Sequence, residues 1–284
     1  MKEFLLHILK TKYNTIATPS TYNTPLGISQ FIQTELNSKT EIMIVEMGAY
    51  VQGDIRKLCD ITPPKIAVLT GITEQHLERF KNLATIIKTK FEICENLPND
   101  GLLVIDGENE HIQQGLKNLA NKPNKNRTTK GIGNIPTKNL PDFEGISFEF
   151  EGETYQSILL GSHNAKNLAL AISIAKHLET PTDIIQKNIK NIQAVEHRMQ
   201  LIRNEKTGIL VIDDSFNGNL EGVKATIHLL KNTPFSGQKI YLTPGLVELG
   251  NKAEEVHRQI GEMLATAIDK VLLVKNKETQ NIEI

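Results

Sequence analysis

The sequence predicts an α/β protein built on a doubly wound, mostly parallel sheet, and its pattern of short apolar runs carries that prediction. Runs of strand length, each ending in polar or glycine-containing residues, occupy residues 42–45, 66–69 and 102–105. Such runs are typical of strands that are buried on both faces of a parallel sheet. Between the last two runs, residues 83–94 repeat apolar side chains at helical spacing. Strands that alternate with helices in this way indicate a sheet covered by helices.

A small β excursion off the sheet is expected where this alternation loosens, over about residues 109–160. Residues 121–136 are polar and rich in turn-forming residues, and residues 146–160 alternate around a Glu-Gly pair like an antiparallel hairpin. A helix is expected from near Asn164, followed by a shorter helix that ends near Ile192.

Two domains are expected, because 284 residues exceed the usual size of a single domain. Residues 1–194 would form the first domain and residues 195–284 the second. In the second, strands and helices are expected in turn at residues 209–212, 220–230, 239–244, 253–268 and 270–275. Because the chain stops one strand after the last of these helices, we expect the second domain to be incomplete.

The charge composition gives no electrostatic reason to expect a nucleic acid or a membrane surface as a partner, because 32 Lys and Arg balance 33 Asp and Glu. The two cysteines, Cys59 and Cys94, form no CxxC pair, so we interpret them as buried thiols in a reducing cytoplasm. No signal peptide is visible. No apolar run approaches the roughly 20 residues of a membrane-spanning helix, so we expect a soluble, cytoplasmic protein.

Three polar residues in the first half of the chain are candidates for binding chemistry, because open α/β sheets bind ligands outside the carboxyl ends of their strands. Glu46 directly follows an apolar run, where its carboxylate is either a Mg²⁺ ligand or an ordinary acid at the end of a strand. His76 lies in a loop, as a ligand or as a hydrogen-bonded loop residue. Lys90 continues the inward apolar stripe of its helix. Its buried ammonium then requires either a charged partner or a functional role, or else its stem packs while the ammonium reaches solvent at the edge of the helix.

A second set of candidates contains asparagine, aspartate and arginine. Asn164 and Asn167, in GSHNAKN, are neighbours on one face of the expected helix, although asparagine at a helix start is commonly a cap. Asp213 and Asn217, in DDSFNGN, come after a strand-like run. Arg198, in EHRMQ, has a planar fork that suits phosphate oxygens, although an exposed arginine often has no specific role.

Eight segments in order along the chain carry a family resemblance. They are TYNTPLGI (21–28), IVEMGAYVQGDI (44–55), TGITEQHLERF (70–80), KTKFEI (88–93), GSHNAKNLALA (161–171), EHRMQ (196–200), DDSFNGN (213–219) and TPGLVELG (243–250). Together they resemble the Mur ligase family. The EMGA and TPGLVELG segments are most similar to the branch that adds D-alanyl-D-alanine to UDP-N-acetylmuramoyl-tripeptide in peptidoglycan assembly. The resemblance implies a central ATPase-type domain at 1–194 and a partial, Rossmann-like C-terminal domain at 195–284.

The resemblance also implies the chemistry of an ATP-dependent amide ligase. Enzymes of this family phosphorylate a carboxylate with ATP, and an amine then attacks the acyl phosphate. By that resemblance Glu46 and His76 would bind Mg²⁺, and Lys90 would match the family's carbamylated lysine. A carbamate is an anion, so it could hold a second Mg²⁺, and the metals would neutralise charge on the transferring phosphoryl group.

Other matched positions imply contacts with small-molecule substrates. Asn164 and Asn167 match residues near the nucleotide, whereas Arg198, Asp213 and Asn217 match positions where the C-terminal domain closes over ATP. The loop that faces the UDP-muramoyl peptide corresponds to Tyr22, Asn23 and Thr24. We expect D-alanyl-D-alanine as the amine substrate and a monomeric chain.

The sequence departs from the family at the phosphate loop, since it contains no G-x-x-x-x-G-K-[ST] motif. In relatives this loop immediately precedes a helix that residues 2–9 resemble. We therefore expect a chain truncated at both ends, inactive alone and poorly soluble, because phosphoryl transfer depends on positioning and a lost strand exposes a sheet edge. Two alternatives stay open: another amide ligase on this scaffold, similar to folylpolyglutamate or cyanophycin synthases, and a non-catalytic Mur-like remnant.

Overall fold

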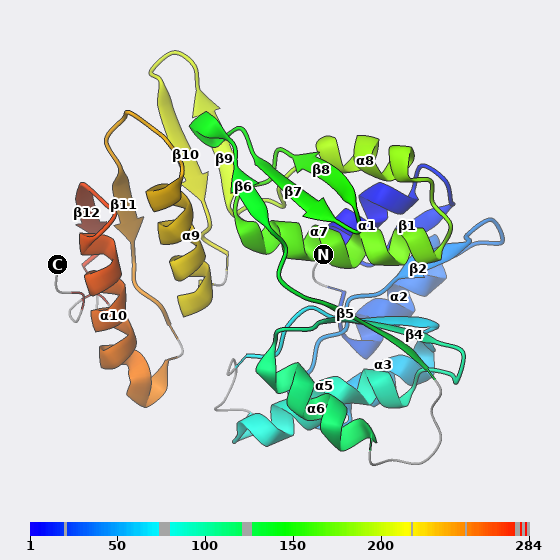
Figure 1. Cartoon of the computed structure of the whole chain (residues 1–284). Helices are drawn as coiled ribbons and strands as arrows, with labels where there is room; N and C mark the ends of the chain where they lie inside the picture. Colours follow the sequence, from blue (N-terminus) through cyan, green and yellow to red (C-terminus); the bar gives the residue numbers. More distant parts are fainter. Residues whose placement is uncertain are drawn as a thin grey trace. The chain divides into compact units, whose positions relative to one another are not determined.

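The structure of the 284-residue chain is a computed structural model (Figure 1). It describes residues 1–19, 22–73, 80–120, 127–216, 218–247 and 249–275, together with residues 279 and 282. The chain forms two compact units. The first contains Met1–Ile135 and Lys166–Ile189, and the second contains Pro136–Ala165 and Lys190–Ile284.

Parallel strands form the centre of the first unit (Figure 1). Strand β1 (Thr15–Ala17) pairs with β2 (Ile42–Ile44). Strands β3 (Ile66–Leu69), β4 (Leu102–Asp106) and β5 (Thr128–Ile132) pair in that order. The middle strand, β4, is buried along almost its whole length, as a continuous apolar run predicts. The prediction of a largely parallel α/β fold is therefore confirmed.

Helices of the first unit cover these strands with apolar faces. They are α1 (Lys2–Leu9), α2 (Pro25–Glu35), α3 (Asp54–Ile61), α5 (Leu83–Glu95), α6 (Glu110–Ala120), most of α7 (Ser162–His177) and α8 (Thr182–Lys190). Leu58, Phe91 and Leu103 belong to one buried core that joins helices to strands. Both cysteines are buried and free, which confirms their interpretation as buried thiols. No helix among the described residues has the length and apolarity that a membrane crossing requires.

The close packing of α6 on α5 depends on Gly115, because a Cβ at this position would overlap the buried ring of Phe91. Gly115→Ala is therefore expected to lower the free energy of unfolding by about 1–3 kcal/mol, the usual cost of overpacking a core. Urea unfolding monitored by circular dichroism measures this change. Gly133→Ala is the matched control, because a Cβ at Gly133 meets no atom within 4 Å. Equal destabilisation by both substitutions would contradict the packing account.

The prediction that the strand and helix alternation is lost over residues 109–160 is wrong for the first half of that range. Helix α6 and strand β5 continue the α/β alternation there, and β5 pairs with β4 in parallel. Neither element is a continuous apolar run, and the burial of each gives the physical reason. Of the side chains described in α6, few are fully buried, and β5 exposes most of its residues to solvent. Neither element therefore shows the continuous apolar run of a strand or helix buried on all sides.

The second unit begins with the expected β excursion. Strands β6 (Thr137–Asn139), β7 (Ile146–Phe150) and β8 (Glu153–Ser157) form an antiparallel sheet, with a short 3-10 helix, η1 (Pro141–Phe143), between the first two. Phe150 pairs with Glu153 across the hairpin turn, which confirms the hairpin predicted around the Glu-Gly pair.

The rest of the second unit follows the expected strand and helix order, with the short helix η2 and one strand in addition. Strand β10 (Ile209–Asp213), helix α9 (Leu220–Asn232), strand β11 (Ile240–Thr243), the short helix η2 (Gly250–Lys252), helix α10 (Ala253–Ala265) and strand β12 (Lys270–Leu273) follow in turn. Strands β11 and β12 are parallel. The additional strand is β9 (Gln200–Asn204), which pairs with β10 in antiparallel orientation and was not expected from the sequence.

Candidate functional site

Glu46 lies just beyond the carboxyl end of β2, where the sequence places it. Its backbone N–H donates to the Thr18 hydroxyl at 3.1 Å, and the Thr18 N–H donates to the Ile44 carbonyl at 3.0 Å. Because Thr18 itself is buried, these bonds fix the backbone of Glu46 against the end of β1. The Glu46 side chain is 48% exposed, so its carboxylate is fixed at the base and open to a ligand at the tip.

Lys2, at the start of α1, is the closest described cation to this carboxylate. Its Nζ lies 3.5 Å from Glu46 Oε2 and 3.2 Å from Glu3 Oε1, and it donates a hydrogen bond to the Thr18 carbonyl. The Lys2 side chain is only 9% exposed. Sequence reasoning missed this residue, because it treated residues 2–9 only as a helix. A lysine that opens an apolar helix beside the first strand is the signal that could have found it.

Lys90 approaches the same carboxylate from α5. It is partly buried on the inward stripe of that helix, as the spacing predicts. Burial lowers the pKa of the Lys90 ammonium, and the nearby Glu46 carboxylate partly offsets this by raising it. The structure therefore brings two of the three predicted metal-site residues together. A lysine with a lowered pKa holds more of its neutral amine form, which is the form that reacts with CO₂.

The donor set at this site fits a hard cation in part. Glu46 supplies carboxylate oxygen, the ligand type that Mg²⁺ prefers, and a carbamylated Lys90 would supply more. His76 falls within residues 74–79, outside the described part of the chain. Among the residues that are described, no group of three or more His, Cys, Asp and Glu could hold a metal ion.

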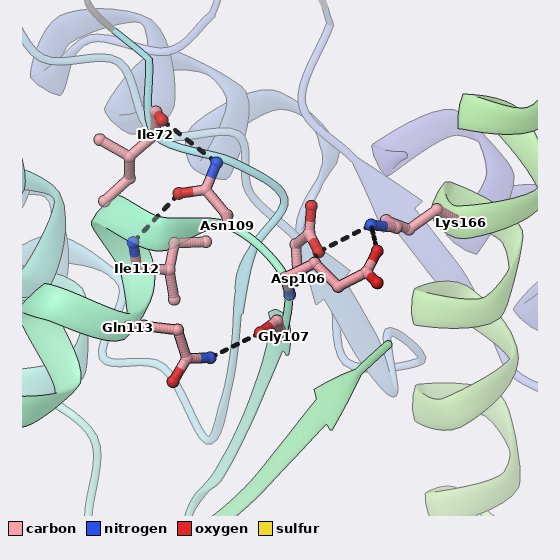
Figure 2. Close-up of polar contacts among 8 residues, drawn as sticks. Ile72, Asp106, Gly107, Asn109, Ile112, Gln113 and Lys166 are labelled. Atoms are coloured by element: carbon pink, nitrogen blue, oxygen red, sulfur yellow. Dashed lines mark hydrogen bonds and ion pairs between the residues drawn. The ribbon is translucent and has the colours of Figure 1, made fainter. Parts of the chain in front are cut away.

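An ion-pair cluster lies at the carboxyl end of β4 (Figure 2). Lys166 of α7 places its Nζ 3.0 Å from Asp106 Oδ1 and 2.7 Å from Glu108 Oε2. Burial alone would lower the pKa of Lys166, but its hydrogen bonds to Glu108 and Asp106 outweigh this effect and raise that pKa. Sequence reasoning singled out Asn164 and Asn167 but missed Lys166 between them. The cluster joins α7 to the turn that follows β4.

The same turn contacts the segment that follows β3, through Asn109 (Figure 2). Asn109 Oδ1 accepts a hydrogen bond from the Ile112 backbone N–H at 3.0 Å, which caps α6. Its Nδ2 donates to the Ile72 carbonyl at 3.2 Å. Ile72 stands four residues before His76 in the sequence. The polar turn after β4 is therefore hydrogen-bonded to Ile72, in the segment that precedes His76 in the sequence.

Asn164 and Asn167 lie in the first turns of α7, three residues apart. Asn164 is buried, and its Nδ2 donates to the Leu160 carbonyl at 2.7 Å. Asn167 is partly buried. Part of the hydrogen-bonding capacity of Asn164 thus serves the fold, while its Oδ1 stays available as an acceptor.

In the second unit, the segment before β9 contacts the segment that ends β10 and follows it, because His197 pairs with Asp213 and Arg198 contacts Phe216. Asp213 ends β10, and its Oδ2 lies 2.7 Å from His197 Nδ1, while its Oδ1 accepts the Ser215 N–H at 3.1 Å. The Arg198 guanidinium lies 4.5 Å from the centre of the Phe216 ring, a cation–π contact that holds an exposed arginine in place. Asn217 lies outside the described residues.

The pairing of His197 with Asp213 predicts how the pKa of each side chain differs from its usual value. The hydrogen bond that the Asp213 carboxylate accepts from the His197 ring raises the pKa of His197 above 6.5, and the same bond lowers the pKa of Asp213 below 3.8. The stabilisation from protonated His197 is therefore complete below 6.5 and is lost as pH rises through the raised pKa. Asp213→Asn is expected to lower the pKa of His197, as measured by NMR titration of its ring protons. Glu196→Gln, which removes an acid 3.7 Å from Nε2, should change it less. An unchanged pKa in Asp213→Asn would contradict the pairing.

The expected substrate loop touches the EMGA segment that contains Glu46. The Gly48 N–H donates to the Asn23 carbonyl at 3.1 Å, and a Cβ at Gly48 would lie 2.9 Å from Asn23 Cγ. Thr24 has a local role, since its hydroxyl accepts the Gly27 N–H at 3.3 Å and caps α2. Tyr22 is partly buried. Asn23 therefore contacts Gly48, which follows Glu46 by two residues in the sequence.

Comparison with known families decides the assignment. A profile described as the Mur ligase middle domain matches residues 1–175, and one described as the Mur ligase, glutamate ligase domain matches residues 197–283. The chain belongs to the Mur ligase family.

Individual Mur ligases match nearly the whole chain. The UDP-N-acetylmuramoyl-tripeptide–D-alanyl-D-alanine ligase of Buchnera aphidicola subsp. Baizongia pistaciae is 30% identical over 273 residues, which cover 93% of this chain and 58% of the relative. The enzyme of the same name from Bacillus subtilis is 27% identical and is covered to 59%. The chain thus spans about three-fifths of the length of the curated relatives it matches.

Solved structures agree with this assignment. The MurF ligase of Thermotoga maritima in complex with ADP superposes with a TM-score of 0.85 at 27% identity, over 99% of this chain and 65% of that one. The apo form of L. casei FPGS superposes with a TM-score of 0.67 at 15% identity, over 96% of this chain and 75% of that one. The second likeness shows the fold alone.

Among the candidate residues of this Mur ligase chain, Glu46 and Lys90 are electrostatic neighbours in the first unit. In the second unit, Arg198 contacts Phe216 and Asp213 pairs with His197. His76 and Asn217 lie outside the described residues. The side chains that sequence reasoning missed are Lys2, Lys166, Asn109, His197 and Phe216, which contact predicted site residues or the loops that carry them.

Proposed function

We propose that this chain is the catalytic part of an ATP-dependent ligase that adds D-alanyl-D-alanine to UDP-N-acetylmuramoyl-tripeptide, in the assembly of peptidoglycan. One observation carries the proposal. Lys90 lies near enough to Glu46, beyond the carboxyl end of β2, for the Glu46 charge to act on its pKa, in a chain that matches D-alanyl-D-alanine ligases over more than nine-tenths of its length. The cytoplasm, which holds ATP and the nucleotide-linked precursor, would be its location, and it would act there as a monomer.

The proposed reaction has two steps. An oxygen of the tripeptide carboxylate attacks the γ-phosphorus of ATP, so that ADP leaves and an acyl phosphate forms. The amino group of D-alanyl-D-alanine then attacks the acyl carbon, loses a proton, and expels inorganic phosphate as the amide forms. Each step develops or moves negative charge on phosphoryl oxygens, so fixed positive charge and exclusion of water are what the protein must supply.

The residues for the first step lie at the carboxyl end of β2. Glu46 and His76 would hold one Mg²⁺, and Lys90 would hold a second after carbamylation. Bound Mg²⁺ would neutralise charge on the phosphoryl oxygens. The hydrogen bond from the Glu46 N–H to the Thr18 hydroxyl fixes the backbone that carries this carboxylate before any ligand arrives, which supports preorganisation of the site.

The remaining candidates would bind the substrates. Asn164 and Asn167 would contact the nucleotide, since the Thermotoga maritima relative binds ADP. Arg198, Asp213 and Asn217 would contact ATP from the second unit, with the guanidinium of Arg198 held by the Phe216 ring. The UDP-muramoyl peptide would contact Tyr22, Asn23 and Thr24.

A chimeric ligase tests this function, with this chain in place of the matched region of the Bacillus subtilis relative. Phosphate release from ATP is measured with UDP-N-acetylmuramoyl-tripeptide and D-alanyl-D-alanine. Release that requires both substrates would support the proposal. Because the chain contains no G-x-x-x-x-G-K-[ST] motif, we expect the chain alone to release little phosphate. Release by the chimera that is independent of D-alanyl-D-alanine would contradict the proposal.

A second ligase function shares this scaffold. The chain superposes on L. casei FPGS with a TM-score of 0.67, so the fold alone also suits a folylpolyglutamate-type ligase. The same assay separates the two, because glutamate and a folate would then replace D-alanyl-D-alanine and the UDP-sugar peptide as the substrates that stimulate release. No release with either pair would favour a non-catalytic Mur-like protein.

A further inference from the structure

The carboxylate of Glu46 already has a positively charged neighbour within the protein. Lys2 Nζ lies 3.5 Å from Glu46 Oε2, and the ammonium of Lys90 approaches the same carboxylate from α5. Glu3 shares Lys2, with its Oε1 3.2 Å from Nζ. While Lys90 is an ammonium, two ammonium groups and two carboxylates therefore lie near one another at this end of the sheet, and no excess negative charge is left for a divalent cation. Carbamylation would remove the positive charge of Lys90 but would leave that of Lys2.

Lys2 cannot leave this position as a surface lysine would. Its side chain is only 9% exposed, whereas an exposed lysine keeps its head in water and changes rotamer freely. Its Nζ also donates to the carbonyl of Thr18, and the hydroxyl of the same residue fixes the backbone of Glu46. Lys2 and Glu46 are thus anchored on one residue, and the distance between their charges is set by the fold.

A fixed ammonium beside Glu46 has a direct electrostatic consequence. A divalent cation that binds Glu46 must approach a unit positive charge at a few ångströms, in a partly buried place where charges are weakly screened. The repulsion is relieved when a ligand brings its own negative charge, because phosphate oxygens accept hydrogen bonds from an ammonium and also bind the metal.

We propose that Lys2 makes metal binding at Glu46 conditional on an anionic, phosphate-bearing ligand. Without that ligand, Lys2 is the counter-cation of Glu46 and weakens the binding of a divalent ion. With it, the ammonium contacts phosphate oxygen, and metal and nucleotide bind as a unit. This inference rests on the proposed metal site at Glu46. It adds Lys2 as a residue that tunes that site, a role distinct from ligation of the metal.

The experiment measures the affinity of the purified chain for Mn²⁺ by electron paramagnetic resonance of the free ion, with and without ADP. Lys2→Met keeps most of the apolar stem and removes the charge. We expect it to raise the Mn²⁺ affinity without ADP by about tenfold, and to reduce the enhancement that ADP produces in the original chain. Lys2→Arg keeps the charge and should preserve both values, which controls for a change in packing.

Two further variants define the site. Lys10→Met removes an exposed cation that follows the same helix and should change neither affinity. Glu46→Gln should abolish the binding on which the comparison depends, which shows that the ion occupies the site beside Lys2. Thermal unfolding of each variant verifies that it is folded before its affinity is compared.

The outcomes separate this inference from the proposed function. A higher Mn²⁺ affinity and a smaller ADP enhancement in Lys2→Met would support it. An unchanged or lower affinity, or an ADP enhancement equal to that of the original chain, would overturn it while the metal site stands. Absence of Glu46-dependent Mn²⁺ binding in the original chain, with and without ADP, would overturn the proposed metal site and this inference together.

Discussion

Lys90→Ala in the chimeric ligase is expected to reduce substrate-dependent phosphate release by about 10³-fold, the usual order for removal of one fixed charge from a phosphoryl-transfer or acyl-transfer site. The physical reason is the position of Lys90. Burial lowers its pKa beside the Glu46 carboxylate, and a carbamate on its Nζ would turn a cation into a metal ligand. Initial rates of phosphate release at saturating substrates measure the effect.

Chemical rescue makes this prediction specific. If a carbamate on Lys90 holds the metal, the carboxylate of a small acid such as formate would take its place in Lys90→Ala, so added formate should restore part of the rate. Chloride at equal ionic strength should restore none. Lys88→Ala is the matched control, because Lys88 is exposed on the same helix and its removal should leave the rate unchanged. Lys90→Ala with nearly the original rate would contradict the role proposed for Lys90.

Glu46→Gln is expected to reduce the rate of the chimeric ligase by at least about 100-fold, because the amide keeps the shape of the side chain but is a poor ligand for Mg²⁺. The loss should be partly reversed at high Mg²⁺ concentration, since the substitution weakens binding of the ion. The dependence of the rate on Mg²⁺ concentration measures both effects.

Glu3→Gln is the matched control for this substitution. Glu3 and Glu46 both pair with Lys2, and their side chains are exposed to similar extents, 46% and 48%. Only Glu46 follows a strand at the carboxyl end of the sheet. If both substitutions lowered the rate equally, the loss would come from the ion pair with Lys2, and the role of Glu46 as a metal ligand would be refuted.

The sequence predicted those parts of the fold that carry strong apolar patterns. Strands β2, β3 and β4 are continuous apolar runs, and the β7–β8 hairpin alternates around a Glu-Gly turn, so each was found. Strand β5 was missed because it exposes most of its residues. Helix α6 was missed although it is amphipathic, with Ile112 buried and Leu116 and Leu119 packed against the core. Strand β9 was missed because it pairs with β10 through backbone hydrogen bonds while exposing most of its residues.

The residues of the candidate site also divide into those that the sequence predicted and those that it did not. Lys90 could be found because an inward lysine interrupts a helical apolar stripe, and Glu46 because it follows a strand directly. Lys2, Lys166 and Asn109 could not, since their contacts join residues far apart in the sequence, such as Lys166 with Asp106 and Asn109 with Ile72. Sequence spacing reports neighbours within one helix or strand, whereas these contacts depend on how separate elements pack.

The proposed ligase reaction is tested most directly by following the oxygen atoms of the substrate carboxylate. UDP-N-acetylmuramoyl-tripeptide labelled with ¹⁸O in the reacting carboxylate is incubated with the chimeric ligase, ATP and D-alanyl-D-alanine, and the released phosphate is analysed by mass spectrometry. An acyl phosphate predicts one ¹⁸O atom in each phosphate released, because the bridging oxygen leaves with phosphorus. Unlabelled phosphate would show that water attacks ATP, and would contradict the function proposed for this chain.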